Sequence, residues 1–487
     1  MKAGVAKRDI TNPNPELPPM DNLFAKALVL DDGCKKLVFV TMDTTGIGAR
    51  KVSDYMLNDV GEDFLPELRK LVEEELGIPE CNVAVNASHT HPVGKLLCDD
   101  EEQVKLVFQA VKEAAENLEE VKIGAGTGEE KRISINRTLR MKDGRQWTIR
   151  HSNPCPPDDE VKELGPLDSS IGILRVDRLD GTPLAIVYNF ACHLLWGDAR
   201  NRITANIPGI ASRALEQSLG NGCMAFFLQG CAGDVMDLNY KDFHVPRDIE
   251  KLGLMLADST LKAYYGIDTD EAEVEVFSEK IRVPRRSDIP EKVERLKEEQ
   301  AELLKSLHGM PLNFRSFLPL YIQYMMNPKF SLDYSYKYLH AEDIGSVELR
   351  EQDKVNQANL DRYLQNIKAM EKLARIQDQI ATLEKHQKIN DASGESDIEM
   401  EVQVIKIGDC VLITSPAELL TEIGLRLKKA SKFEHTFIAG YTNGYVHYGT
   451  PAEDYALRGY EVTECLLAPE WQKLFEETVV KLLGNLK

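Results

Sequence analysis

Two histidines one residue apart, His89 and His91, stand in the segment "VNASHTHPVG". The segment includes part of an apolar, β-branched run at 83–85, so we expect both histidines at the end of a strand. In an extended chain, residues i and i+2 point to the same side, so both imidazoles can enter one site. Neutral imidazole is a ligand for Zn²⁺ and similar ions. Taken alone, this spacing is more often that of surface or core histidines.

Other candidate ligands are spread along the chain. His193 ends the strand-like run "AIVYNFACH", where a lone histidine also fits a core residue bonded to a backbone carbonyl. Glu418, in "TSPAELLTEIG", is expected where a strand gives way to a helix, and a glutamate in a first helical turn is favoured by the helix dipole alone. A tyrosine cluster at 441–460 fits aromatic packing in a loop.

The elements that must position these residues follow an α/β pattern. From residue 2 to about 280, strand-sized apolar runs alternate with amphipathic stretches. Hairpins are predicted at 27–43 and 171–193, with Asp-Gly turns, and helices at 63–77 and 104–118. The apolar run "MAFFLQ" breaks into the Gly-rich turn "GCAGD", and α/β proteins often place their chemistry in such turns.

A long helical insertion is predicted in the second half of the chain. Residues 286–390 are polar and rich in Glu, Lys, Gln and Leu, with two long helical patterns around an aromatic stretch. This divides the chain into a domain made of 1–285 and 391–487 and an insertion at 286–390. The insertion fits a solvated arm, an element for homo-oligomer formation or a cover for the active site.

The composition of the chain limits the kinds of molecule that it is expected to bind. The chain has 487 residues, 43% of them hydrophobic, and a formal net charge of −20. So acidic a surface argues against nucleic acid or an anionic membrane as the main partner. The sequence shows neither a signal-peptide core nor an apolar run of about 18 residues. The nine cysteines form no CxxC pair and fit free thiols, so we expect a cytoplasmic protein.

Several motifs resemble the catalytic domain of the neutral ceramidase family, in the family's order. They are "SHTHPVG", "NFACH", "SPAE" and "NGYVHYGTPAEDYALRGYE", with "GVAKRDIT", "INR" and "FLQGCAGDV" elsewhere. The resemblance covers most of the chain outside the insertion. It implies that domain's α/β fold with a mixed β-sheet, interrupted here by the helical insertion.

The resemblance also implies a site. One Zn²⁺ would be held by four residues: His89, His193, Glu418 and Tyr448. His91 would lie beside the metal as an acid/base group, and Tyr460 would point at the reacting carbonyl. A zinc-activated water could then attack that carbonyl, with Tyr460 stabilising the oxyanion and His91 protonating the leaving nitrogen.

Two departures from the family pattern bear on the substrate. The turn "GDVMDLN" carries Met236 where ceramidases have a serine, so chemistry that needs this hydroxyl is excluded. Asp234 remains in the turn, where it fits either a group that binds substrate or a turn cap. The chain ends soon after the tyrosine motif, so we expect no C-terminal immunoglobulin-like domain and a substrate other than ceramide.

Polar residues near the motifs suit a hydroxylated ligand, although each also fits a turn or surface position. The candidate substrate-binding residues are Asn136, Arg137, Asp168, Asn206 and Tyr445. The preferred hypothesis is a zinc hydrolase that cleaves an amide bond of a small polar substrate, such as an N-acylated sugar or amino acid. The alternatives are a carbohydrate-active metalloenzyme, either glycoside hydrolase or lyase, and a non-catalytic scaffold assembled through the insertion.

Overall fold

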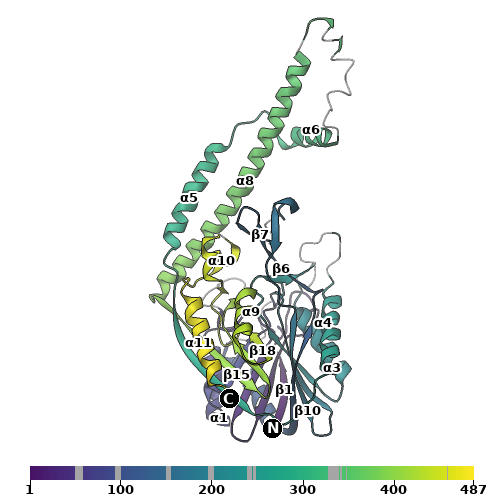
Figure 1. The fold of residues 1–487 in the computed structure, drawn as a ribbon, viewed down its shortest axis with the longest axis vertical. Helices are drawn as coiled ribbons and strands as arrows, with labels where there is room; N and C mark the ends of the chain where they lie inside the picture. The colour runs from purple at the N-terminus through teal and green to yellow at the C-terminus, as the bar shows by residue number, and fades with distance from the viewer. Residues whose placement is uncertain are drawn as a thin grey trace. The chain divides into compact units, whose positions relative to one another are not determined.

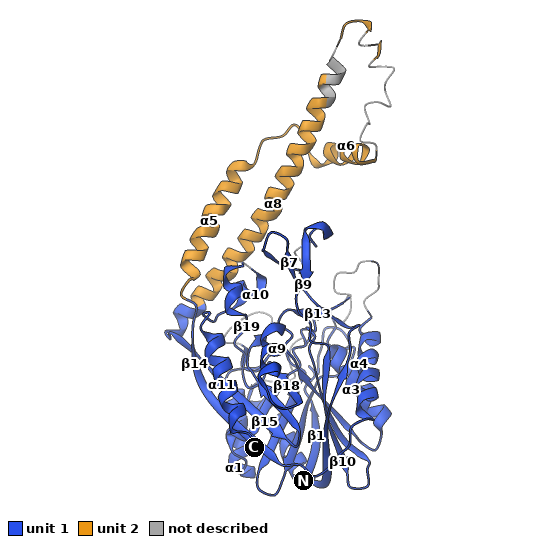
Figure 2. Cartoon of the chain, in the orientation of Figure 1, with its two compact units in different colours: residues 1–286, 389–487 blue, residues 287–388 orange. Residues whose placement is uncertain are grey.

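The computed structural model describes most of the chain. The described residues are 1–49, 59–93, 100–149, 155–195, 202–238, 244, 248–326, 339–340, 343–346, 348–457 and 459–487, with the backbone alone at 348–350 and 352–353. They divide into two compact units (Figure 2). The first contains residues 1–286 and 389–487, and the second contains residues 287–388.

The first unit is built around a large mixed sheet. Within the described residues, eight strands pair in the order β12-β11-β10-β5-β1-β2-β3-β4. Their bounds are β1 Lys2–Asp9, β2 Phe24–Asp31, β3 Lys36–Met42, β4 Val83–Ala87, β5 Glu119–Glu129, β10 Ser170–Arg178, β11 Pro183–Phe190 and β12 Met224–Gln229. Neighbours are antiparallel except β3 with β4 and β11 with β12, which are parallel at the two edges.

A second sheet has the order β14-β15-β16-β18. Its strands are β14 Val274–Pro284, β15 Asp397–Ile407, β16 Cys410–Thr414 and β18 His435–Ala439. The long pair of β14 with β15 is antiparallel, and β16 with β18 is parallel. The helical insertion therefore enters after β14 and returns into β15.

Alternating side chains along the strands create three apolar layers. On β2, Leu28 and Leu30 join an inter-sheet cluster with Phe226 and Leu412, while Ala25 and Ala27 face the opposite way into a helix-covered cluster. This is the period-2 alternation of a strand buried on both faces. The outer face of the second sheet forms the third layer.

Helices cover both outer faces, so the unit has the layer order helices, large sheet, second sheet, helices (Figure 1). On the large sheet lie α1 Phe64–Leu76, α2 Asp100–Glu116, α3 Asn206–Leu219 and α4 Ile249–Tyr264. On the second sheet lie α9 Thr421–Ala430 and α11 Trp471–Asn485. α1 ends at Gly77, whose φ of 64° is the left-handed conformation that commonly terminates helices.

Short elements complete this unit. Two-stranded pairs are formed by β6 Ser134–Asn136 with β13 Val235–Asp237, and by β17 Glu418–Leu419 with β19 Tyr448–Gly449. A small three-stranded sheet contains β7 Thr138–Met141, β8 Gln146–Thr148 and β9 Val161–Leu164, and α10 covers Tyr460–Glu464. Single 3₁₀ turns occur at η2 Glu80–Asn82, η3 Asp158–Glu160 and η5 Ala452–Ala456.

The second unit is helical. It contains α5 Ile289–Ser306, α6 Phe314–Met326 and most of α8 Glu348–Ser393. Ile289 and Val293 of α5 pack against Ile380 and Leu383 of α8. Ion pairs flank this seam, including Lys372 with Glu299 at 2.7 Å.

The fold class predicted from the sequence is confirmed: the first unit is a mixed-sheet α/β fold and the long helix is present. Both predicted hairpins form, as β2–β3 and β10–β11. Among the described residues, no helix is long and apolar enough to cross a membrane. The eight cysteines in the described part of the chain are free thiols, and Cys98 lies outside it.

One buried ion pair joins segments that are far apart in sequence. The guanidinium of Arg69 on α1 donates to both carboxylate oxygens of Glu401 on β15, at 2.7 and 3.2 Å. The same guanidinium donates to Val83 O, and Ser278 donates to Glu401. The pair ties the part of the unit before the insertion to the part after it.

Removing one charge of this pair leaves the other buried without its partner. We expect Glu401→Gln to lower the free energy of unfolding by about 3–5 kcal/mol, measured by urea denaturation. Glu101→Gln on α2 is the control, because Glu101 forms an exposed i,i+4 pair with Lys105 and should change little. Equal stability of both variants would show that the Arg69 pair does not hold these segments together.

Candidate metal centre

Two buried imidazoles face each other where the large sheet ends. The Nε2 atoms of His89 and His193 lie 3.1 Å apart. His89 Nδ1 is 2.7 Å from Thr45 O, and His193 Nδ1 is 2.9 Å from Ala232 O. A carbonyl oxygen can only accept, so each Nδ1 carries the proton and each Nε2 directs its lone pair toward the other.

A carboxylate completes this arrangement. Glu418 Oε2 lies 3.5 Å from His89 Nε2 and 3.7 Å from His193 Nε2. Two imidazole lone pairs and a carboxylate oxygen thus face one another, an arrangement that a cation would stabilise. Ligands of a tetrahedral zinc ion at about 2.0–2.1 Å are spaced about 3.3 Å apart, so these residues fit a zinc-sized ion.

His91 lies at the edge of the cluster. Its Nε2 is 3.2 Å from His89 Nε2, and the three imidazoles together form a group that could hold a metal ion. His91 is half-buried, whereas His89, His193 and Glu418 are almost fully buried. The carboxylate also brings negative charge to the cation, so we favour Glu418 as the third ligand and His91 as a neighbour.

The backbone before and at His89 is shaped by its neighbours. Ser88 N donates to Met42 O and His89 N donates to Thr44 O. His89 itself has a φ of 62°, a left-handed backbone conformation that residues other than glycine rarely adopt. The two histidines therefore converge through a strained turn after β4, rather than through the alternation of an extended strand.

A glycine turn brings the support for His193 into place. Gly233 N donates to Leu419 O, and a Cβ at Gly233 would lie 2.6 Å from Glu418 O. Only glycine therefore lets the 232–234 turn approach β17 this closely. The turn supplies Ala232 O to His193 while lying against the strand that carries Glu418.

Gln229, at the end of β12, links both histidine-bearing segments. Its Nε2 donates to Ser88 O and to Cys192 O, both at 2.9 Å. These carbonyls immediately precede His89 and His193, and Gln229 is fully buried. Sequence reasoning missed this residue, and the only signal was a polar side chain at the end of an apolar run.

Tyrosines surround Glu418. Tyr445 OH donates to Glu418 Oε1, and Tyr441 OH donates to Oε2 at 3.3 Å. Tyr448 also hydrogen-bonds Glu418 through its side chain. In addition, Tyr448 of β19 is the strand-pairing partner of Glu418 of β17. The Tyr441 ring lies 4.2 Å from that of His89, a role that the sequence did not reveal.

Arg137 supports the tyrosines from behind. It donates to Tyr448 OH at 2.9 Å, to Gly233 O at 2.6 Å and to Glu461 at 3.0 Å. Its guanidinium also lies 5.5 Å from the centre of the Tyr460 ring. These contacts make Arg137 a buried positioning group, and they reveal Glu461 as its partner, which the sequence analysis had not selected.

Asp234 and Asn136 lie in a saturated network near the turn. Asp234 accepts hydrogen bonds from the backbone and hydroxyl of Thr421, at 2.8 and 2.7 Å, and from Asn136 Nδ2 at 2.7 Å. Asn136 Nδ2 also donates to Pro166 O. The carboxylate therefore anchors the first turn of α9.

The two remaining candidates differ in their surroundings. Asp168 accepts from Lys428 Nζ at 2.6 Å and from Ser170, so it ties β10 to α9. Asn206 opens α3 with a φ of 59°, and its Nδ2 is buried with no partner among the described residues. Thr204 N donates to Pro92 O, which places the start of α3 near the His91 turn.

Burial sets the charge state of the cluster. It lowers the pKa of His89 to about 3 and holds the pKa values of His91 and His193 well below the ordinary value. Burial also raises the pKa of Glu418. All three imidazoles are therefore neutral at pH 7, the form that binds a metal ion.

Comparisons with known proteins found similarity to neutral ceramidases. The family described as "Neutral/alkaline non-lysosomal ceramidase, N-terminal" matches residues 335–476. Neutral ceramidase of Pseudomonas aeruginosa is 29% identical over 95 residues, which are 18% of this chain and 14% of that protein. The Oryza sativa subsp. japonica neutral ceramidase is 33% identical over 95 residues, 17% of this chain and 12% of its own length.

The crystal structure of the Pseudomonas aeruginosa neutral ceramidase extends the match. It superposes on 99% of this chain and 74% of its own, with a TM-score of 0.60 and 18% identity. The chain is thus similar to neutral ceramidases in sequence over part of its length and in fold over nearly all of it. Its histidine cluster is a candidate metal site. The sequence alignments span only 12–14% of the curated relatives' length.

The ligand set can be separated by variants. His193→Ala should lower bound zinc well below one equivalent, because one of two facing Nε2 atoms is lost, whereas His91→Ala should retain zinc. Zinc is measured by elemental analysis of the purified protein. His435→Ala is the control, because His435 begins β18, whereas the candidate ligands lie beyond the other end of that strand. Full zinc content in His193→Ala would show that His193 is not a ligand. Loss of zinc only in His91→Ala would make His91 a ligand instead.

Gln229 offers a test of the support around the ligands. Gln229→Leu should weaken zinc binding about 10–100-fold, because the carbonyls before both histidines lose their shared donor. Affinity is measured by competition with a chelator. The control is Gln472→Leu, another buried glutamine, which accepts from Ala452 N on the outer face of the second sheet. Weakening of the same size in both variants would indicate a general loss of stability instead.

Proposed function

We propose that the protein is a zinc-dependent hydrolase that cleaves an amide bond of a small polar substrate. The observation that supports it most is the cluster of His89 Nε2, His193 Nε2 and Glu418 Oε2, three acceptors at 3.1–3.7 Å. Tyr448 would be the fourth ligand. The similarity to neutral ceramidases supports the choice of an amide bond.

Zinc bound there would supply a Lewis acid that polarises a carbonyl and lowers the pKa of a water. The protein's own groups supply the proton transfers. His91 is neutral, since burial lowers its pKa, and its half-buried ring can accept a proton from water and pass it to the leaving nitrogen.

Phenols and the buried guanidinium would support the developing oxyanion. Tyr460 lies against Tyr448, with ring centres 5.7 Å apart, and Arg137 lies over both rings. Burial works against the charge of Arg137, yet Tyr448 and Glu461 hold its pKa well above the ordinary value. A fixed positive charge behind the two phenols would favour negative charge on an oxygen in front of them.

Two features favour a small polar substrate over a lipid. Met236 occupies the position where the family pattern has a serine, so water is left as the attacking group. Asn206 Nδ2 is a buried donor without a partner among the described residues, near the His91 turn. An amide or hydroxyl oxygen of a polar substrate would satisfy that donor.

The zinc-loaded protein should release primary amine from N-acetylated sugars or amino acids, measured with fluorescamine. Tyr460→Phe should keep its zinc but lower kcat about 10²–10³-fold, through loss of an oxyanion donor. Tyr265→Phe is the control, because Tyr265 is an exposed tyrosine directly after α4.

Two outcomes would count against this proposal. A new reducing end or an unsaturated sugar, with no amine released, would assign the site to glycosidic cleavage or elimination. An unchanged rate in Tyr460→Phe would make that tyrosine structural.

A further inference from the structure

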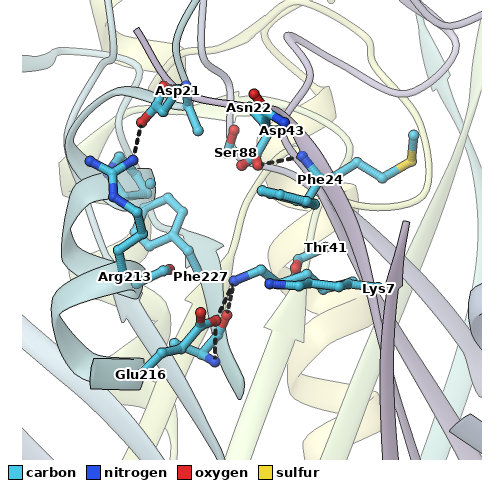
Figure 3. A pocket seen from close by; sticks show the side chains of 17 residues that line it. Lys7, Asp21, Asn22, Phe24, Thr41, Asp43, Ser88, Arg213, Glu216 and Phe227 are labelled. Carbon is cyan, nitrogen blue, oxygen red and sulfur yellow. Dashed lines mark hydrogen bonds and ion pairs between the residues drawn. The ribbon is translucent and has the colours of Figure 1, made fainter. Parts of the chain in front are cut away.

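A separate cavity of about 300 Å³ lies between α3 and strands β2, β3 and β12 (Figure 3). None of the clustered imidazoles, nor Glu418, lines it. Part of its wall is apolar, with the rings of Phe24 and Phe227 and the side chains of Met42 and Pro208. The cavity is therefore a space of its own with an apolar surface for a small ligand.

Most of the charges around this cavity already have partners. Asp21 pairs with Arg213 at 2.7 Å, and Lys26 pairs with Glu216 at 2.7 Å and donates to Ala225 O. Lys7 places its ammonium 4.8 Å from the centre of the Phe24 ring. The Lys7 ammonium therefore already lies over one face of the Phe24 ring.

Asp43 is the exception. Its Oδ2 accepts from Phe24 N at 2.9 Å, but among the described residues no cationic nitrogen lies within 4.0 Å of the carboxylate. Burial raises its pKa to about 7, which reflects the cost of an unpaired carboxylate.

The neighbouring hydroxyl is unsatisfied too. Ser88 Oγ is buried and has no hydrogen-bond partner among the described residues, although Ser88 is only 3% exposed and lines the same cavity. Ser88 N donates to Met42 O, the residue before Asp43, and both side chains line the cavity (Figure 3). This part of the wall therefore combines a carboxylate that has no cationic partner with a serine hydroxyl that has no partner among the described residues.

We propose that this cavity binds a small organic ammonium ion with a short apolar body. The ammonium would donate to the Asp43 carboxylate and to Ser88 Oγ, which satisfies both groups. The apolar body would lie against Phe24 and Phe227. A carboxylate ligand is disfavoured, because it would meet Asp43 with like charge.

The position of the cavity links it to the histidine cluster. The segment that carries Asp43 also provides Thr44 O to His89 N and Thr45 O to His89 Nδ1. A ligand on Asp43 would therefore contact the same segment that orients His89. The proposal concerns binding alone and does not depend on zinc or on catalysis.

The test uses isothermal titration calorimetry on the full chain. n-Butylammonium should bind at millimolar concentration, whereas n-butanol and butyrate should bind at least about tenfold more weakly, since they lack the charge-assisted hydrogen bond. Asp43→Asn keeps an oxygen for Phe24 N but removes the charge, and should weaken n-butylammonium binding about tenfold or more. Ser88→Ala should weaken it about threefold.

Asp21→Asn is the matched control, because Asp21 lines the same cavity but already pairs with Arg213. It should leave the affinity within about threefold. Circular dichroism checks that each variant is folded. Absence of n-butylammonium binding, equal binding of n-butanol, or equal losses in Asp21→Asn and Asp43→Asn would each overturn the proposal. Should Asp43→Asn fail to fold, the ligand comparison and Ser88→Ala still decide it.

Discussion

The site depends on one electrostatic constraint: two imidazole lone pairs and a carboxylate oxygen face one another at 3.1–3.7 Å inside the protein. The carbonyls of Thr45 and Ala232 impose it, since each fixes a proton on Nδ1 and leaves Nε2 without one. Such acceptors repel one another at low dielectric. The fold must therefore hold them together, and a bound cation would turn this repulsion into attraction.

Packing between the two sheets keeps the three acceptor atoms close together. The histidines follow β4 and β11 of the large sheet, whereas Glu418 follows β16 of the second sheet. The apolar layer between the sheets fixes how closely these strand ends approach, because buried side chains pack at near-crystalline density. Gly233 and Gln229 then connect the ends through backbone contacts. The ligand atoms are thus positioned by packing far larger than the site itself.

Local sequence patterns predicted the helices and strands, but not which of their side chains come together in the folded protein. The β2–β3 hairpin follows from alternating apolar residues around an Asp-Gly turn, and α1 from an amphipathic stretch that ends at Gly77. The support of His193 by Ala232 O spans 39 residues and depends on tertiary folding, so His193 alone looked like a core histidine. Arg137 was a candidate for substrate binding for a similar reason. The sequence shows that a guanidinium is present, but not that it already donates hydrogen bonds to Tyr448 and Glu461.

The backbone of Met236, rather than its side chain, supports the candidate metal centre. Its backbone forms a bridge with His193, and His193 N donates to the adjacent Val235 O. These contacts use only main-chain atoms, so any side chain at 236 preserves the support of His193. The thioether is almost fully buried and cannot act as a nucleophile. The position therefore helps to build the candidate centre through its backbone, and in the proposed reaction the attacking group would be water.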